Sequence, residues 1–202
     1  MHREIEPKIL YLGTPVVLIS TSNEDGSPNL APMSSAWWLK KSCMLGLGTR
    51  GKTFENLKRE KECVLNLPSS DMVSAVDRLA LTTGKYPVPD YKVEMGFQYI
   101  KDKFGRAGLT ALESQIVRPP RVAECPVQLE AVVENIHDFA SPDSSLASIE
   151  VKIIRAYFHD DILNQEKRHY VDTDKWKPLI MSFCEFYGVG DKLHPSKLAK
   201  VF

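Results

Sequence analysis

The sequence has no long apolar run and no closely paired cysteines. No stretch of its 202 residues approaches the ~18 apolar residues that a membrane-spanning helix needs. Residues 1–6 are mostly charged or polar, whereas a secretory signal peptide needs an apolar centre. The four cysteines, at positions 43, 63, 125 and 184, include no Cys-x-x-Cys pair, which disfavours a zinc site and a disulfide framework. We therefore expect a cytoplasmic protein with buried, reduced thiols and no membrane partner.

The sequence also lacks an excess of charge of either sign. Lys plus Arg equals Asp plus Glu at 26 each, so no global field favours nucleic acid, and no nucleic-acid partner is expected. The histidines show no ligand spacing, so no metal is expected. Hydrophobic residues make up 43% of the chain and charged residues 26%, which is typical of a globular protein. We predict a single domain over residues 1–202, with a C-terminal extension from about residue 178.

The chain alternates between short apolar segments and turn-forming residues. Residues 15–22 are β-branched and apolar, as in a buried strand, and the Asp25-Gly26 turn predicts a hairpin back into residues 28–32. Further strands are predicted at residues 42–47, 63–67, 127–135, 148–158 and 179–186, helices at residues 54–61 and 71–79, the second capped by Asp71, and a loop at residues 82–90. The predicted fold is mainly β with peripheral helices, arranged as an antiparallel barrel.

Residues 46–53 carry the strongest local signal for a ligand. The segment Gly-Leu-Gly-Thr-Arg-Gly-Lys-Thr lies between a predicted strand and a predicted helix and matches the pattern G-x-x-x-x-G-K-[ST]. Its glycines let backbone N–H groups converge, and the helix start offers free donors and a positive dipole end. Arg50 and Lys52 add charge, and Thr49 and Thr53 add hydroxyl donors. We expect a ligand that carries a phosphate; the alternative is a glycine-rich turn with solvated basic residues.

The same pattern occurs in nucleotide triphosphatases, which need two further features. One is an apolar strand ending in an Asp that holds magnesium, and the other is a parallel sheet with long helices. Neither candidate strand, at residues 63–67 or 149–158, ends in such an Asp, and the segment follows a predicted hairpin. An ATPase is therefore the less favoured alternative.

An ordered set of short segments runs through most of the chain. They lie at residues 15–22, 25–26, 29–35, 46–56 (with Lys-Thr-x-x-Asn), 64–68, 102–104, 107–110, 124–127, 149–152, 161–163 and 186–190. In this order they resemble the flavin-reductase-like family, which includes flavoredoxins. Each segment alone is weak, but the ordered set is specific.

The resemblance implies an FMN-binding split β-barrel that holds the cofactor non-covalently near a dimer interface. The phosphate would meet basic and hydroxyl side chains before the first helix, and backbone groups after the first hairpin would bond the polar edge of the ring. The candidate cofactor-binding residues are Thr49, Arg50, Gly51, Lys52 and Thr53 for the phosphate, and Met33, Ser34, Ser35 and Ala36 for the ring.

Three further residues are expected near this site. Trp37 is predicted to cover or border the flavin ring, since indole stacks well on a flat aromatic system. The alternative is that strand alternation sends one of Trp37 and Trp38 into the core and the other to an interface. Asn56 and Asn66 are expected behind the contacting residues, and Asn66 is well placed to satisfy buried backbone at a strand end.

The resemblance implies an FMN-dependent oxidoreductase, either an NAD(P)H:flavin reductase or a flavoredoxin-like electron-transfer protein with a redox partner protein. A flavin carries this chemistry itself, so no catalytic side chain is assigned. Many family members have a Gly-Asp-His segment where nicotinamide approaches, but residues 141–148 here contain no histidine. His137 and Asp138 lie upstream and either substitute for it or are solvated. The alternative function is a non-enzymatic protein that holds FMN, haem or another phosphorylated ligand.

The sequence contains more large apolar side chains than a small barrel and short helices readily hide. They are Trp37, Trp38, Leu39, Phe183, Phe186 and Tyr187. Burial between two subunits is the usual outcome for such residues, and a closed two-fold pair is the commonest assembly. The resemblance points the same way, so a homodimer is predicted.

Overall fold

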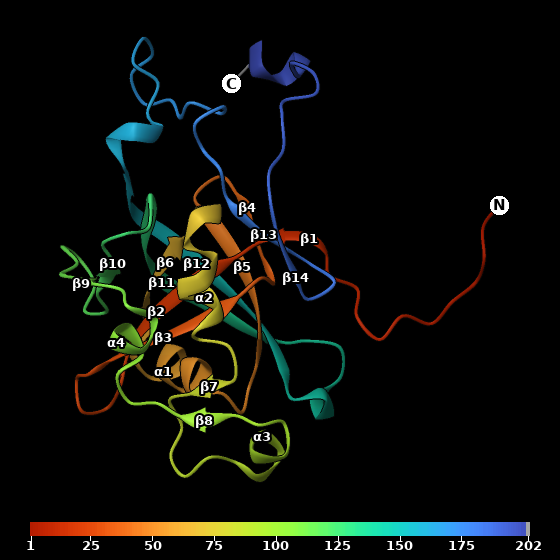
Figure 1. Ribbon diagram of the computed structural model, residues 1–202. Helices are drawn as coiled ribbons and strands as arrows, with labels where there is room; N and C mark the ends of the chain where they lie inside the picture. Colours follow the sequence, from red (N-terminus) through yellow and green to blue (C-terminus); the bar gives the residue numbers. More distant parts are fainter. Residues whose placement is uncertain (201–202) are drawn as a thin grey trace.

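The computed structural model describes residues 1–200 and consists mainly of β-strands (Figure 1). The strands are β1 (Leu12–Pro15), β2 (Val17–Ser22), β3 (Pro28–Met33), β4 (Ala36–Leu39), β5 (Ser42–Gly48), β6 (Glu62–Leu67), β7 (Thr82–Thr83), β8 (Gln98–Tyr99), β9 (Ala111–Leu112), β10 (Arg121–Val122), β11 (Val127–Asp138), β12 (Leu146–Phe158), β13 (Leu179–Ser182) and β14 (Glu185–Gly188). The helices are α1 (Lys52–Glu60), α2 (Val73–Asp77), α3 (Asp90–Glu94) and α4 (Lys103–Ala107), with short 3-10 turns at Ser70–Met72, Pro142–Ser144, Asp160–Ile162 and Lys197–Lys200. Among the described residues, no helix is long and apolar enough to cross a membrane.

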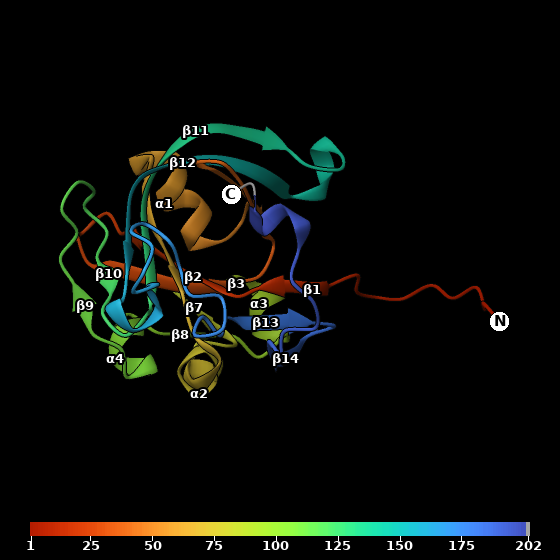
Figure 2. The same cartoon turned by 90° about the horizontal axis from the view of Figure 1, so that it is seen from above.

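Seven of the strands form one antiparallel sheet in the order β3-β2-β6-β11-β12-β5-β4. Its two edge strands, β3 and β4, are joined only by Ser34 and Ser35. The sheet must therefore curl until its edges meet, which makes a barrel that stays split along the β3–β4 seam. Seen from above, β11 and β12 curve around one side while β2 and β3 run along the other (Figure 2). This confirms the predicted fold class, an antiparallel split barrel with peripheral helices.

Strand β2 lies between two hydrophobic layers, which explains why all six of its residues are buried. Val17 and Ile19 belong to the cluster inside the barrel. Leu18, on the other face, packs in a second cluster with Val76 of α2 and Phe104 of α4. Because successive side chains of a strand point to opposite faces, a strand covered on both sides reads as the continuous apolar run seen in the sequence. Full burial of each such side chain stabilises the fold by about 1.5–3 kcal/mol.

Three sequence-based assignments of secondary structure were wrong. The helix expected at residues 71–79 is a 3-10 turn followed by the five-residue α2, whose N-cap is Met72 and not Asp71. The loop expected at residues 82–90 contains β7, which pairs with β8. The single strand expected at residues 179–186 is a hairpin, because Phe183 and Cys184 both take positive φ angles between β13 and β14. Non-glycine residues seldom adopt such angles, so residues 183 and 184 carry no turn signal.

Asn66 links three parts of the barrel. Its Nδ2 donates to the Leu18 carbonyl oxygen at 3.0 Å and to Ser20 Oγ at 2.9 Å, and its Oδ1 accepts from the Val122 backbone N–H at 2.8 Å. The residue is fully buried. It therefore satisfies buried backbone groups at a strand, as one interpretation of the sequence proposed.

Three of the four free cysteines, Cys43, Cys63 and Cys125, are buried, and the fourth is not. Burial raises the pKa of Cys43 to about 12, and it raises the pKa values of Cys63 and Cys125 as well. These thiols are therefore protonated near neutral pH and behave as core side chains. Cys184 is a correction to the expectation, because the hairpin turn between β13 and β14 exposes it.

Candidate functional site

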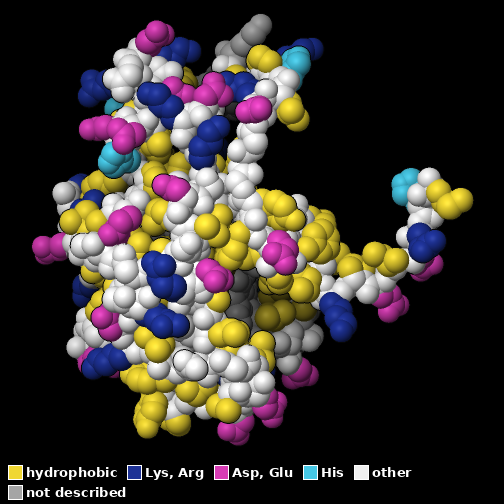
Figure 3. All heavy atoms as spheres, in the orientation of Figure 1, with side chains coloured by type: hydrophobic (Ala, Val, Ile, Leu, Met, Phe, Trp, Pro, Cys, Tyr) yellow, Lys and Arg dark blue, Asp and Glu magenta, His cyan; other side chains and the backbone are white. Residues whose placement is uncertain are grey.

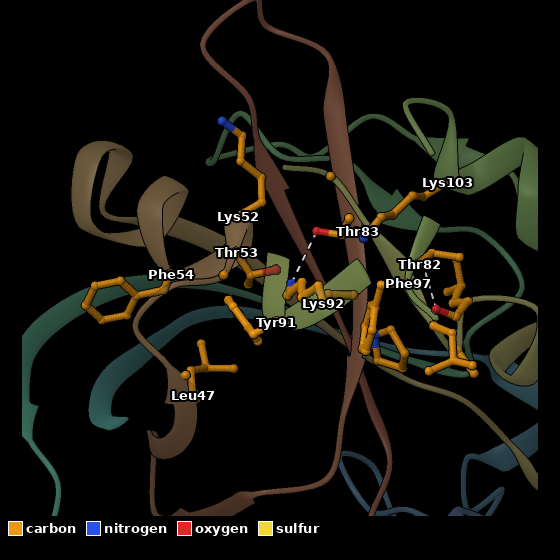
Figure 4. A pocket seen from close by; sticks show the side chains of 18 residues that line it. Leu47, Lys52, Thr53, Phe54, Thr82, Thr83, Tyr91, Lys92, Phe97 and Lys103 are labelled. Carbon is orange, nitrogen blue, oxygen red and sulfur yellow. Dashed lines mark hydrogen bonds between the residues drawn. The ribbon is translucent and has the colours of Figure 1, made fainter. Parts of the chain in front are cut away.

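A cavity of about 330 Å³ lies where the start of α1 meets the end of β5 and the first hairpin. Residues 79–84, α3 and Lys103 of α4 form its other walls. Figure 4 shows the side chains of Thr53, Thr83 and Lys92 close together at its centre. The cavity therefore lies beside residues 46–53, where the sequence predicts a phosphate.

The first turn of α1 presents free backbone donors to this cavity. Gly51, the N-cap, has an extended backbone and supplies no side-chain cap. Among the described residues, the backbone N–H groups of Lys52, Thr53 and Phe54 have no hydrogen-bond acceptor. Free N–H groups together with the positive end of the helix dipole favour an anion at this place.

Thr53 is held in position from behind by a buried asparagine. Asn29 Nδ2 donates to Thr53 Oγ1 and to Thr21 Oγ1, both at 3.2 Å. The other amide atom, Asn29 Oδ1, is buried and has no partner among the described residues. A Cβ at position 84 would lie 2.6 Å from this oxygen. The backbone of the cavity wall therefore lies so close to Asn29 that only glycine fits at position 84.

Two lysines from the segment after α2 bring uncompensated charge to the cavity. Lys92 Nζ donates to Thr83 Oγ1 at 3.2 Å, and burial lowers the pKa of Lys92, with nearby Lys85 adding to the effect. Lys103 is 4% exposed, and burial together with Lys92 lowers its pKa to about 8. Neither amine forms an ion pair with an acidic side chain among the described residues. Two like charges held together in a half-buried cavity favour binding of an anion.

The basic residues named from the sequence are less directly engaged with the cavity. Lys52 Nζ lies 2.6 Å from Glu24 Oε2 and 3.9 Å from Glu55 Oε2, and Figure 4 shows this amine pointing away from Lys92. Arg50 is exposed, and its guanidinium lies 4.3 Å above the ring centre of Tyr91. Both side chains would have to turn inward to reach a ligand in the cavity.

Thr49 and Asn56 lie beside the cavity but do not line it. The Thr49 backbone N–H donates to the Ser145 carbonyl oxygen at 2.9 Å, so this donor is already used. Asn56 is fully buried, and its Nδ2 donates to Thr21 Oγ1 at 3.0 Å and Asn23 Oδ1 at 2.9 Å. Asn56 thus attaches α1 to the first hairpin.

The residues expected along a flavin ring lie at the seam of the barrel. Met33 and Ser34 line a second hollow of about 160 Å³, which shares Pro32 and Ala80 with the larger cavity. Ser35 and Ala36 complete the seam: the Gly46 N–H donates to the Ser35 carbonyl oxygen at 2.8 Å, and the Ala36 N–H donates to that of Ser34 at 3.0 Å. Two adjoining hollows give room for an elongated ligand with a charged end and an apolar end.

Trp37 lines neither of the two hollows. Its side chain is 58% exposed and lines a separate surface depression together with Leu39. Trp38 turns the other way and packs against the barrel core. This outcome follows the alternation of side chains along β4, and it agrees with the part of the alternative interpretation that sends one tryptophan to the core.

The segment at residues 141–148, which lacks the family histidine, contacts the turn before α1. Residues 139–145 join β11 to β12, residues 146–148 begin β12, and Ser145 contacts Thr49 as described above. His137 and Asp138, near the end of β11, are exposed. Among the described residues, no group of three or more His, Cys, Asp or Glu side chains could hold a metal ion.

Lys92 and Lys103 were missed as site residues by the sequence analysis. Lys92 lies just after a stretch interpreted as a loop, so nothing assigned its side chain to a cavity. Lys103 belongs to an Asp-Lys-Phe segment that contributed to the family resemblance but received no role. Only the tertiary placement of α3 and α4 brings these lysines into the wall of the cavity that Thr53 also lines.

The fold and the cavity define a split-barrel protein with a cavity lined by basic and hydroxyl side chains beside its seam, and comparison with known proteins identifies the family. Residues 10–175 match the family model of the flavin reductase like domain, so the chain belongs to that family. The uncharacterized protein YdfE of Bacillus subtilis (strain 168) is 42% identical over 188 residues, which cover 93% of this chain and 89% of that protein.

Two solved structures share the fold. Flavoredoxin of Desulfovibrio vulgaris (Miyazaki F) has a TM-score of 0.80 at 20% identity, with 99% of this chain and 100% of the other covered. A putative flavin reductase with a split barrel domain from Shewanella frigidimarina NCIMB 400 has a TM-score of 0.71 at 18% identity, with 91% and 85% covered.

These findings confirm the resemblance read from the ordered segments. The family match also supports the expected class of function at the level of a flavin-reductase-like protein. The ATPase alternative does not fit, because the seven strands around residues 46–53 form an antiparallel sheet.

Proposed function

We propose that the protein binds FMN non-covalently and works as an FMN-dependent oxidoreductase. The observation that carries this proposal is the cavity in which free N–H groups of α1, Thr53 and two lysines converge, neither lysine having an acidic partner among the described residues. The terminal phosphate would bind there, with Arg50 and Lys52 turning inward to close over it. The ring would extend along the seam at residues 33–36.

The chain's own residues would bind and orient the cofactor. Bound FMN would supply the hydride and electron chemistry. Thr53, fixed by Asn29, would donate its hydroxyl proton to a phosphate oxygen, and backbone groups at Ser34 and Ser35 would face the polar edge of the ring. The shared wall at Pro32 and Ala80 would keep water from the stretch between the two ends.

The proposal also concerns the source of the electrons that reduce the flavin. Family membership supports reduction by NAD(P)H, whereas the absence of a histidine from residues 141–148 supports a flavoredoxin-like carrier that receives electrons from a redox partner protein. We propose the carrier role as the main one and the NAD(P)H:flavin reductase role as the second. Three buried free thiols support a place in the reducing cytoplasm.

The proposal predicts a preference for FMN over FAD and riboflavin. The cavity offers hydrogen-bond donors for one phosphate, and riboflavin has no phosphate to accept from them. The chain also has no G-x-G-x-x-G after a strand, the pattern that would hold the pyrophosphate of FAD. Fluorescence titration of the purified protein with each flavin measures this preference. Anaerobic addition of NADH or NADPH then separates the two roles, because a reductase bleaches the flavin absorbance and a carrier needs dithionite or a protein donor. Riboflavin that binds as tightly as FMN would refute the phosphate assignment.

We also propose that the protein is a homodimer. Figure 3 shows hydrophobic side chains gathered over β1, β13 and β14. Leu12 is 72% exposed, Phe183 51% and Tyr187 55%, while Trp37 and Leu39 are exposed on β4. Exposed apolar area of this extent is typical of a surface that a partner covers.

Light scattering of the FMN-loaded protein at micromolar concentration is expected to give about twice the 22.8 kDa of one chain. If the subunits share the flavin site, dilution should release flavin together with subunits, because binding and association are then linked. A monomer that retains FMN would end the proposal, while a dimer that keeps its flavin on dissociation would exclude only the shared site.

A further inference from the structure

Lys103 is the most deeply buried cation of the cavity. It is the first residue of α4 and is 4% exposed. Figure 4 shows its side chain running from α4 toward Thr83 and Lys92. A buried ammonium group needs a hydrogen-bonded counter-charge, since moving an unpaired charge out of water is strongly unfavourable.

The described residues provide no such counter-charge. Asp102, the neighbouring acid, uses its Oδ1 to accept from the Gly105 N–H at 2.8 Å, as the N-cap of α4. Glu55 is engaged by Lys85 at 2.5 Å, and Glu24 by Lys52 at 2.6 Å. The amine of Lys103 has no hydrogen bond or ion pair with any of the described residues.

No charged residue on the elements around Lys103 supplies the missing counter-charge. Strand β3, which packs against α4, carries no ionisable residue. Helix α2 carries only Asp77, which is exposed, and the adjoining Arg78 donates to the Ala107 carbonyl oxygen at 3.1 Å. Helix α3 carries Lys92 toward the cavity, while its Asp90 and Glu94 are exposed and Tyr91 lies under Arg50.

We propose that Lys103 is an anion-binding residue at the inner end of the cavity, and that it makes retention of a phosphate-bearing ligand depend on pH above neutrality. This inference rests on the proposed function in taking that ligand to be FMN. Lys92 is already hydrogen-bonded to Thr83, so Lys103 is the cation that gains most from an arriving phosphate.

The direction of the pH dependence follows from linkage. Without ligand, burial and Lys92 lower the pKa of Lys103 to about 8, and a bound phosphate dianion raises it again. Below about pH 8 the amine is already protonated, and binding takes up no proton. Above that pH, binding must take up a proton, so affinity falls about tenfold per pH unit until the pKa of the complex is reached.

The test compares Lys103→Met with Lys101→Met. Lys101 lies two residues earlier, is exposed and pairs with Asp25 at 3.2 Å, so its variant loses the same charge outside the cavity. The affinities for FMN and riboflavin are measured by fluorescence from pH 6 to 10. The quantity compared is the affinity for FMN divided by that for riboflavin, because titration of the flavin ring affects both affinities and cancels in this ratio. For the wild-type protein and Lys101→Met, the ratio should fall about tenfold per unit above pH 8.

Lys103→Met should lower FMN affinity about 10- to 100-fold at pH 7 and leave riboflavin affinity unchanged. Its FMN-to-riboflavin ratio should no longer change with pH above 8. A ratio that keeps the wild-type slope overturns the proposal.

A measurement on the wild-type protein guards against misfolding of the variant. Titration of the Lys103 side-chain amine by NMR, with and without millimolar inorganic phosphate, should show a pKa that phosphate raises. An unchanged pKa overturns the proposal even if flavin binds. If no flavin binds to the wild-type protein, the proposed function fails, and the NMR titration with inorganic phosphate still decides the role of Lys103.

Discussion

Replacing Arg50 and Lys52 together by alanine is expected to weaken FMN binding by about 3 kcal/mol, which is more than 100-fold in affinity. Each charge-assisted hydrogen bond to a phosphate contributes about 1.5–3 kcal/mol. We take the lower end because Arg50 is exposed and Lys52 must leave Glu24 to reach the ligand. Fluorescence titration with FMN measures the loss, and riboflavin affinity should change little.

The matched control for this variant is Lys41→Ala combined with Lys58→Ala. Both residues are exposed, and Lys58 lies near the far end of α1, so the control loses the same charge without touching the cavity. FMN affinity of the control should stay within a factor of a few of the wild-type value. Equal FMN affinity in the double variant and the wild-type protein would show that the phosphate does not bind at the start of α1.

Replacing Glu130 by alanine is expected to lower the free energy of unfolding by about 3–5 kcal/mol. The side chain is fully buried. Its carboxylate accepts from the backbone N–H groups of Gln115 at 2.9 Å, Ile116 at 2.8 Å and Val117 at 3.3 Å. The Tyr157 hydroxyl also donates to it at 2.8 Å. Removing the carboxylate leaves these donors unpaired and frees the loop before β10 from the barrel.

Chemical denaturation measures this effect, and Glu134→Ala is the control. Glu134 lies on the same strand, but it is exposed, and among the described residues it pairs with Lys152 alone, at 3.6 Å. Its loss should therefore change stability by less than about 1 kcal/mol. Similar stability losses for the two variants would contradict the clamp that Glu130 forms.

The contribution of Glu130 should also depend on pH. Burial by itself would raise the pKa of Glu130, but the Gln115 N–H, the Tyr157 hydroxyl and the remaining two N–H donors outweigh it, and the pKa is lowered. A carboxyl with a lowered pKa in the folded state stabilises the fold above its unfolded pKa of ~4.3. The difference between wild type and Glu130→Ala should therefore be constant above about pH 5 and shrink below ~4.3.

The local sequence was sufficient where a pattern depends on near neighbours. The Asp25-Gly26 hairpin and the strand at residues 42–47 are present in the structure, because turn geometry and side-chain alternation are local properties. The start of α1 was predicted at residue 54, two residues after its observed start at Lys52, for the same reason. The turn at Phe183 and Cys184 was missed, because neither residue is of a type that favours the positive φ angles of this tight hairpin.

The sequence by itself determined the split-barrel family, through the order of short segments along the chain. It also located the glycine-rich turn before α1 and the seam residues 33–36, each of which is contiguous in the chain. Only the tertiary structure decided which charges face the cavity. It turned the amine of Lys52 toward Glu24 and brought Lys92 and Lys103 to the cavity that Thr53 lines. The direction of a long side chain depends on partners far away in the chain, here 28 residues for Lys52 and Glu24. Pairing and burial of charge are set by packing, and no local pattern encodes them.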